Sequence, residues 1–161
     1  MKKIWFMLLL ALPLALAGCG SDPVQDEILK YVNEEMPKLA DKEEKVIKDY
    51  ESITGQNYTD DQTMYDKLQG TIIPKYNEFI SDLEGVEVDS KDLSNIHEGY
   101  IEAVNIQGEA FVKMTEAIEK QDSGLIAEAN SMLADARKKM RTFQSDIKGL
   151  AKEHDVTFEE K

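Results

Sequence analysis

Apolar residues recur at steps of three and four through nearly all of the chain after residue 22, and no stretch alternates with a period of two for long. Steps of three and four place side chains on one face of an α-helix. The pattern divides into four segments, between Asp22 and Gly55, between Thr59 and Gly85, from Leu93 to Ile118 and from Ile126 to Leu150. The sequence therefore predicts an all-α fold with four long helices.

The helix starts are marked by residues that satisfy free backbone N–H groups. Asp22 suits the N-cap of the first helix, with Pro23 at the first helical position. Thr59 and Gln62 have the spacing of a capping box at the start of the second. Asp89 or Ser90 would cap the third.

Three short connections make consecutive helices antiparallel neighbours. We therefore expect an up-down-up-down four-helix bundle about 40 to 45 Å long, at 1.5 Å per residue. Pro37 and Pro74 would partly kink the first two helices, because proline removes a helix hydrogen bond. The bundle is predicted to occupy residues 22–154. In the C-terminal tail, residues 155–161, Val156 and Phe158 would be able to fold back over the bundle end.

The first eighteen residues have a different pattern. Two lysines precede a mostly apolar run, and small residues then lead to Cys19, the single cysteine of the chain. This is the layout of a secretory signal. The run is shorter than the roughly 20 residues needed to cross a bilayer, and Pro13 interrupts it. Residues 1–18 are predicted to be a cleaved signal peptide, and residues 19–21 a new N-terminus with a short tether.

The stretch Leu16-Ala17-Gly18-Cys19 resembles the lipobox of bacterial lipoprotein precursors. The resemblance implies that Cys19 carries a diacylglyceryl thioether, as opposed to being a lone buried cysteine. It also implies that the mature protein is lipid-anchored to the cell membrane on its extracytoplasmic side. Two acyl chains anchor a protein stably, whereas a single chain does so marginally. The Lys- and Glu-rich body further resembles small helical lipoproteins of Bacillus-type Gram-positive bacteria without assigned function, which implies the outer face of the membrane.

The charge balance is strongly acidic. Removing Lys2 and Lys3 from 19 basic residues leaves 17, and 17 against 32 acidic residues gives the mature chain a net charge of −15. Phosphate binding requires clustered Lys and Arg, so we expect no nucleic-acid partner. The same reasoning predicts that anionic headgroups repel the body, which would leave attachment to the lipid on Cys19.

The sequence contains no motif that specifies catalysis or metal binding. Gly-x-Ser-x-Gly, Glu-x-x-His and phosphate-binding glycine loops are all absent from the chain. His97 and His154 have no second ligand at helical spacing, so we expect a surface or end-cap role for each. We predict no catalytic residue, no cofactor and no metal site. The alternative is weak cation binding by the loop acids Glu87, Asp89 and Asp92.

A possible ligand cavity lies at mid-height. Pro37 precedes Gly55 by about as many residues as Pro74 follows Thr59, so the two prolines are expected at one level. Gln107 on the apolar stripe and Ala136 are expected at that level too. Kinked helices facing such residues would leave a cavity. Alternatively, side chains fill the bundle at mid-height without a cavity, and Gln107 sets the helix register through hydrogen bonds.

The end of the bundle away from Cys19 is the candidate surface for a partner, through Tyr58, Asp60, Asp61 and Asp122. Two functions follow from these features. The first is a non-enzymatic, lipid-anchored binding or scaffold module that contacts an envelope protein or a cell-wall component. The second is a lipoprotein that binds a small ligand or cation in the cavity or at the acidic loops.

Overall fold

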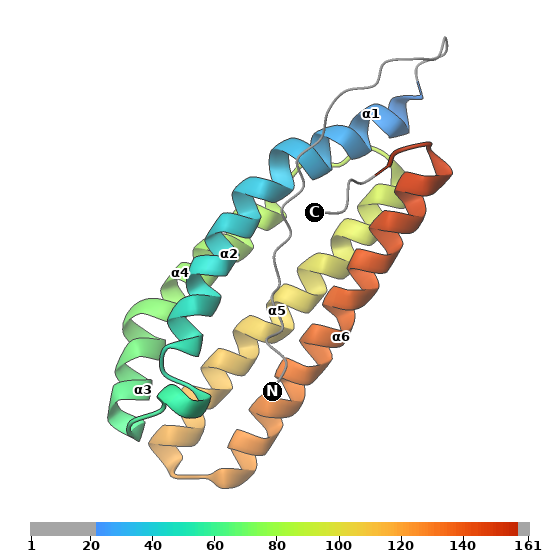
Figure 1. The fold of residues 1–161 in the computed structure, drawn as a ribbon. Coiled ribbons are helices and arrows are strands. Elements are labelled where there is room, and N and C mark those ends of the chain that lie inside the picture. The colour runs from blue at the N-terminus through green and yellow to red at the C-terminus, as the bar shows by residue number, and fades with distance from the viewer. Residues whose placement is uncertain (1–21, 158–161) are drawn as a thin grey trace.

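The computed structural model describes residues 22–157, and every regular element in this range is helical (Figure 1). The α-helices are α1 (Pro23–Lys30), α2 (Met36–Glu51), α3 (Asp61–Lys67), α4 (Ile73–Glu84), α5 (Lys91–Lys120) and α6 (Ser123–Glu153). A π-helical segment joins α1 to α2 (η1, Tyr31–Glu35), another joins α3 to α4 (η3, Leu68–Ile72), and Gly55–Asn57 forms a 3-10 turn (η2). The all-α prediction is confirmed. The expected count of four helices is too low, because a π segment divides each of the first two.

Both π segments end two residues before a proline. Met36 N–H donates to the Tyr31 carbonyl, and Ile73 N–H donates to the Leu68 carbonyl, each five residues back. Pro37 and Pro74 follow at the same offset. A proline in an α-helix lacks a donor and its ring crowds the carbonyl four residues earlier. The wider π turn relieves this crowding, so the helical path continues through each proline.

The helical elements run lengthwise beside one another (Figure 1). The path through α1 and α2 leads to the end where η2 lies, α3 and α4 lead back, and α5 and α6 form a long antiparallel pair. We call the end that holds Asp22 and the connection between α4 and α5 the proximal end, and the opposite end the distal end. The 30 residues of α5 span about 45 Å at 1.5 Å per residue. Among the described residues, no helix is both long and apolar enough to cross a bilayer.

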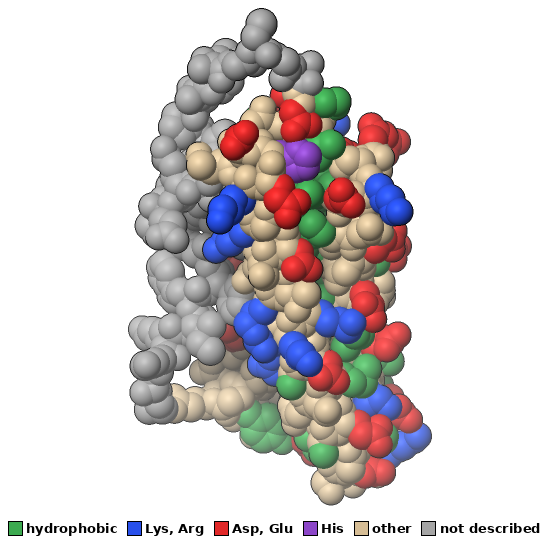
Figure 2. All heavy atoms as spheres, turned by 90° about the vertical axis from the view of Figure 1, so that its right-hand side faces the viewer, with side chains coloured by type: hydrophobic (Ala, Val, Ile, Leu, Met, Phe, Trp, Pro, Cys, Tyr) green, Lys and Arg blue, Asp and Glu red, His purple; other side chains and the backbone are tan. Residues whose placement is uncertain are grey.

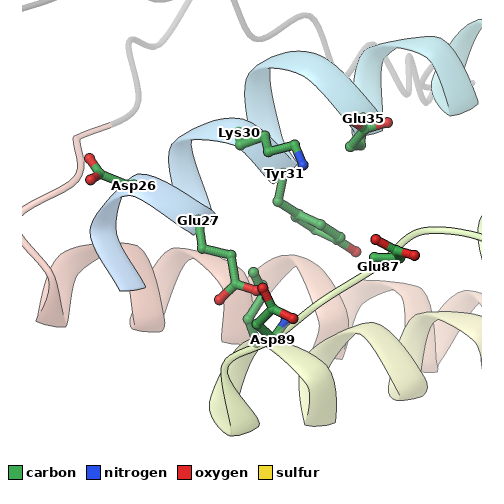
Figure 3. Close-up of a pocket in the computed structure, with 8 residues that line it drawn as sticks. Asp26, Glu27, Lys30, Tyr31, Glu35, Glu87 and Asp89 are labelled. Atoms are coloured by element: carbon green, nitrogen blue, oxygen red, sulfur yellow. The ribbon is translucent and has the colours of Figure 1, made fainter. Parts of the chain in front are cut away.

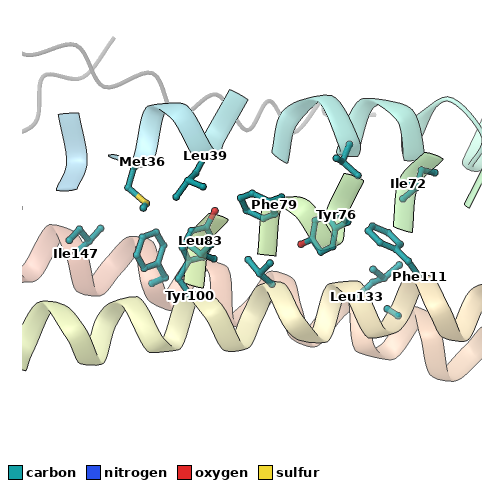
Figure 4. Close-up of a cluster of buried hydrophobic side chains, with 14 of the residues drawn as sticks. Met36, Leu39, Ile72, Tyr76, Phe79, Leu83, Tyr100, Phe111, Leu133 and Ile147 are labelled. Atoms are coloured by element: carbon teal, nitrogen blue, oxygen red, sulfur yellow. The ribbon is translucent and has the colours of Figure 1, made fainter. Parts of the chain in front are cut away.

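Aromatic contacts join the helices into one core (Figure 4). Tyr100 on α5 stacks on Phe143 of α6, with ring centroids 4.4 Å apart. Phe111 of α5 lies 4.9 Å from Tyr50 of α2 and 5.1 Å from Tyr76 of α4. The α5 helix therefore contacts α2, α4 and α6 through aromatic rings, and it forms the centre of the packing.

Helix caps account for the element boundaries. Asp22 accepts a hydrogen bond from Val24 N–H at 3.0 Å, which confirms it as the first N-cap. The predicted capping box at Thr59 is wrong by one residue, because Asp60 caps α3 and accepts from Thr63 N–H at 2.8 Å. Asp60 can do this because its carboxylate reaches the N–H three residues ahead.

The start of α5 is capped by a residue from another helix. Ser90 occupies the N-cap position, but its side chain makes no cap hydrogen bond. Instead, the Glu27 carboxylate of α1 accepts from Ser90 N–H at 3.1 Å and also from Asp89 N–H. A carboxylate at a helix N-terminus is favourable because of the free N–H groups and the helix dipole. This contact ties α1 to α5 at the proximal end.

Gly108 on α5 lies where α4 approaches closely. A Cβ atom at this position would be 3.2 Å from Ile80 Cδ1 and 3.4 Å from Tyr76 Cδ1. Gly149 on α6 is different, because a Cβ atom there would meet nothing within 4 Å. The two glycines therefore separate the effect of close packing from the effect of helix propensity.

We predict that Gly108→Leu lowers the free energy of unfolding by about 1 to 3 kcal/mol, because the added side chain overpacks the contact between α4 and α5. Gly149→Ala, the matched control, should raise it by roughly 0.5 to 1 kcal/mol, because alanine favours the helix. Urea unfolding followed by circular dichroism measures both. If Gly108→Leu left the free energy of unfolding unchanged, α4 and α5 would not be packed as closely at Gly108 as the structure shows.

Candidate functional site

Four polar side chains lie inside the core, and the half-buried Glu43 reaches them from α2: the four are Tyr31, Tyr76, His97 and Tyr100. The Tyr31 hydroxyl and His97 Nδ1 are 2.9 Å apart, and the Tyr100 hydroxyl donates to Glu43 Oε2 at 3.0 Å. The hydroxyl oxygens of Tyr76 and Tyr100 lie within the cluster of apolar side chains (Figure 4). Within the described range, Tyr76 Oη and His97 Nε2 are buried without a hydrogen-bond partner.

Burial shifts this cluster toward uncharged side chains. It raises the pKa of Glu43, although the hydrogen bond from Tyr100 acts in the opposite direction. It raises the pKa of Tyr76 and Tyr100 well above the usual range, and the nearby Glu43 carboxylate adds to both shifts. Burial also lowers the pKa of His97, which favours the neutral ring.

His97 is not at the surface or at a helix end, so that expectation is wrong. Its side chain is 4% exposed and it pairs with Tyr31 from the π segment η1. His154 does lie at an end, after α6, and its Nδ1 is 2.6 Å from Asp22 Oδ2. The hydrogen bond with His154 lowers the pKa of Asp22. This pair connects the first and last helices at the proximal end.

A pocket of about 260 Å³ lies at the proximal end, between α1 and the connection to α5 (Figure 3). Its charged lining residues are Asp26, Glu27, Lys30, Glu35, Glu87 and Asp89. Burial raises the pKa of Glu27, but hydrogen bonds from Ser90 and Asp89 outweigh this and lower it overall. Glu27 therefore serves as a helix cap in its ionised form.

These carboxylates are not arranged as a metal site would require. In the part of the chain that the structure describes, no three His, Cys, Asp or Glu side chains are grouped closely enough to hold a metal ion. Figure 3 shows the Glu27 and Asp89 side chains close together and that of Asp26 apart from them. Asp92, the third of the loop acids considered for cation binding, is exposed in the first turn of α5. The acidic loop gives no support to the cation alternative.

A second hollow, of about 610 Å³, is an open groove between α5 and α6. Apolar side chains such as Ile106, Met132 and Phe143 line it, and a salt bridge of 2.8 Å between Lys139 and Glu102 joins the two helices. Sequence reasoning missed this groove, because its lining combines core and surface positions of two helices.

The four residues of the expected cavity are not brought together. Lys75, next to Pro74, pairs with Asp49 at 2.9 Å, and Asp49 is twelve residues beyond Pro37. Twelve helical residues span about 18 Å, so the expectation that the prolines share one level is wrong. Pro74 is exposed and Pro37 is half-buried.

Gln107 and Ala136 do share a level of the α5–α6 pair. Gln107 is seven residues after Tyr100 and Ala136 is seven before Phe143, which stacks on Tyr100. Ala136 is buried, whereas Gln107 is half-buried and not on the centre of the stripe as expected.

The four residues expected to contact a partner all lie at the distal end. Asp60 and Asp122 cap α3 and α6, and Asp122 accepts from Gly124 N–H at 2.7 Å. Tyr58 is 46% exposed, and its hydroxyl donates to Asp61 Oδ1 at 2.7 Å. Asp61 Oδ2 accepts from Gln121 Nε2 at 3.3 Å, so a hydrogen-bonded unit of Tyr58, Asp61 and Gln121 joins two loops.

Gln121 was not identified from the sequence as part of this surface. It ends α5 with a left-handed backbone, φ +52°, where glycine is the favoured residue. Besides Asp61, its side-chain amide donates to the Ile118 carbonyl at 2.9 Å. A left-handed backbone at a residue other than glycine marks Gln121 as unusual, but this conformation cannot be inferred from the sequence alone.

We predict that Glu43→Gln stabilises the protein at neutral pH by on the order of 1 kcal/mol, because it removes a carboxyl group whose charged form is disfavoured by burial. The native pKa of Glu43 is raised, so its ionisation costs stability as pH rises from the ordinary glutamate value through the native value. In Glu43→Gln, the free energy of unfolding should no longer fall over this pH range. Glu44→Gln, beside it in an exposed pair with Lys48, is the control and should have little effect. Thermal unfolding of both variants at several pH values tests this prediction. An equal change of stability in Glu43→Gln and Glu44→Gln would contradict it.

A family model described as EMYY-motif containing lipoprotein matches residues 1–155 of the chain. The tetrapeptide EMYY itself does not occur in this chain. No curated protein and no solved structure matches the chain. Cys19 and the signal segment lie outside the described residues, as does Phe158. Because the family model covers nearly the full length, the chain belongs to the EMYY-motif containing lipoproteins, which are membrane-anchored on the extracytoplasmic side.

Proposed function

We propose that this lipoprotein is a non-enzymatic binding or scaffold module of the cell envelope, anchored by lipid on Cys19. The stretch Leu16-Ala17-Gly18-Cys19 and the family support the anchor. The first helix begins at Pro23, four residues after Cys19, so the proximal end would lie close to the headgroups. The helical elements would together serve as one four-helix bundle that places the distal end about 45 Å from the anchor.

The distal end is the proposed contact surface, and one observation carries this proposal. Tyr58 and Gln121 come from different loops and both hydrogen-bond to Asp61, which fixes an exposed aromatic ring at the end of the molecule. Tyrosine provides a large contact area and has few rotatable bonds to immobilise, and it is enriched at protein interfaces. A partner of the envelope, either a protein or a cell-wall component, would contact this ring.

A binding role is favoured over an enzymatic one by the chemistry of the polar clusters. The interior cluster around Glu43 favours uncharged side chains, and Glu27 in the proximal pocket is engaged in capping α5. The interior cluster does pair a hydroxyl with an imidazole, those of Tyr31 and His97, but these residues are only 2% and 4% exposed, so a substrate would not reach them.

We predict that a photocrosslinking residue at Tyr58 captures a defined envelope partner in intact cells. The same residue at Asn77, an exposed position of α4 far from the distal end, is the control and should capture much less. With the crosslinking residue at the neighbouring exposed Thr59, which leaves Tyr58 in place, Asp61→Ala should reduce capture several-fold, because Tyr58 loses the hydrogen bond that fixes it. Gel shifts followed by mass spectrometry measure this. Equal capture from Tyr58 and Asn77, or none from Tyr58, would reject the distal contact.

We predict that Cys19→Ala abolishes lipid labelling and leaves an unprocessed precursor or a released protein. The fold should be unchanged, because no residue after Gly20 is a cysteine. Metabolic labelling with a fatty-acid analogue and the mass of the mature N-terminus test this. An unlabelled wild-type protein, or one that starts at another residue, would remove the anchor from the proposal.

A further inference from the structure

The four carboxylates of α6 and four of its six basic residues lie on opposite sides of the helix. Of the other two, Lys139 lies on the acidic side, where it pairs with Glu102 of α5 at 2.8 Å, and Lys138 lies between the two sides. The four carboxylates belong to Glu128, Asp135, Asp146 and Glu153. At about 100° per residue, these positions fall within about 20° of one another. Glu128 pairs with Lys113 of α5 at 3.1 Å, which places this acidic side next to α5.

Four basic residues occupy the other side of α6. Arg137, Arg141, Lys148 and Lys152 fall within about 60° on the helical wheel, and Arg137 lies at least about 160° from each carboxylate. All four are exposed. We call them the basic stripe. Figure 2 looks onto the side of the molecule where α6 lies, and Lys and Arg side chains lie over the middle of this face with Asp and Glu side chains among them.

The basic stripe is not neutralised by neighbouring carboxylates. Elsewhere, lysines are commonly paired, as Lys67 and Lys75 are with Asp49 at 2.8 and 2.9 Å. Among residues 22–157, none of the four stripe residues forms a salt bridge, although the chain carries 32 acidic residues. Their charges are therefore available to an external anion.

One end of the basic stripe lies at the proximal end of the molecule. From Arg137 to Lys152 the stripe extends about 22 Å along α6. Just beyond Lys152, His154 contacts Asp22 at 2.6 Å, and its carbonyl accepts from Gln25 Nε2 at 2.8 Å. Asp22 is three residues after Cys19, so the stripe begins beside the proposed anchor and runs away from it.

We propose that the basic stripe of α6 docks on anionic lipid headgroups, so that the anchored molecule lies along the bilayer. This inference rests on the lipid anchor of the proposed function, which holds α6 within reach of the headgroups. Each Lys or Arg close to an anionic surface strengthens binding by about fivefold. A polybasic patch is also a recognised second signal that complements acyl chains.

The overall negative charge does not prevent this docking. Charges are screened beyond about 8 Å at physiological ionic strength, so carboxylates farther than this from a surface touching α6 contribute little repulsion. The carboxylates of α6 itself point away from the stripe, toward α5. The repulsion expected from net charge therefore does not apply to this face. The distal end would then lie about 45 Å along the membrane from the anchor and would meet partners in or near that plane.

The test uses the full-length lipidated protein, with its acyl chains verified by mass, in vesicles with a headgroup-linked quencher. The vesicles contain phosphatidylcholine alone or with phosphatidylglycerol. A fluorophore is attached through Ser145→Cys, exposed beside the stripe, or through Asn77→Cys on α4; the lipidated Cys19 does not react. We expect several-fold stronger quenching of the Ser145 label in the anionic vesicles, reversed by high salt, and little change for the Asn77 label.

Charge variants separate the stripe from the net charge. Changing Arg137, Arg141, Lys148 and Lys152 to Gln should abolish the added quenching. The control changes four exposed lysines on other helices to Gln, namely Lys38, Lys45, Lys48 and Lys91, and should retain it. Circular dichroism confirms that both variants keep their helices.

Three outcomes would overturn the proposal. In the first, the Ser145 label is quenched equally in neutral and anionic vesicles. In the second, the two charge variants show equal quenching in anionic vesicles. In the third, inorganic polyphosphate binds the basic stripe while anionic vesicles do not quench the label. The last result would identify a soluble polyanion as the ligand. Failure of the anchor is distinguishable, because an unlipidated protein would not float with neutral vesicles.

Discussion

The interior of this molecule depends on apolar stripes that continue past a proline in each of the first two helical paths. Steps of four, such as Ile28, Val32 and Met36, drift around an α-helix, because four residues exceed one turn. A π turn contains more residues per turn and corrects this drift where the proline requires a wider turn. The same local change therefore accommodates Pro37 and keeps the buried side chains facing α5.

The regular features of the fold follow from local sequence signals. Apolar periodicity located the helical segments, Asp22 and Gly85 marked ends, and three short connections gave neighbouring helices opposite directions. The π segments were missed because their signal, repeated steps of four before a proline, is easily interpreted as an ordinary amphipathic helix. The N-cap of α3 is Asp60, one residue after the predicted Thr59, and helix ends are commonly misplaced by one residue in this way.

The candidate site depends on contacts between distant residues, and these could not be inferred from spacing. His97 is buried because Tyr31, 66 residues away, supplies a hydrogen bond. The expected cavity assumed that equal distances from a turn give equal heights, but the pairing of Lys75 with Asp49 shows a shifted register. The distal residues were placed at one end correctly, because loop positions follow from the order of helices. Their joining through Gln121 depends on a left-handed backbone that only the structure shows.

Net charge is a property of the whole chain, whereas a membrane responds to the face that it meets. Basic residues toward the C-terminus of a helix are favourable for the helix dipole, and this accounts for their presence in the last turns of α6. It does not account for the alignment of the basic stripe, which holds four of the six basic residues of α6, because the dipole acts along the helix axis and favours no direction around it. The helix dipole likewise does not explain why the four carboxylates of α6 share the opposite side. Such segregation is expected where one face of α6 meets an anionic surface and the other packs beside α5.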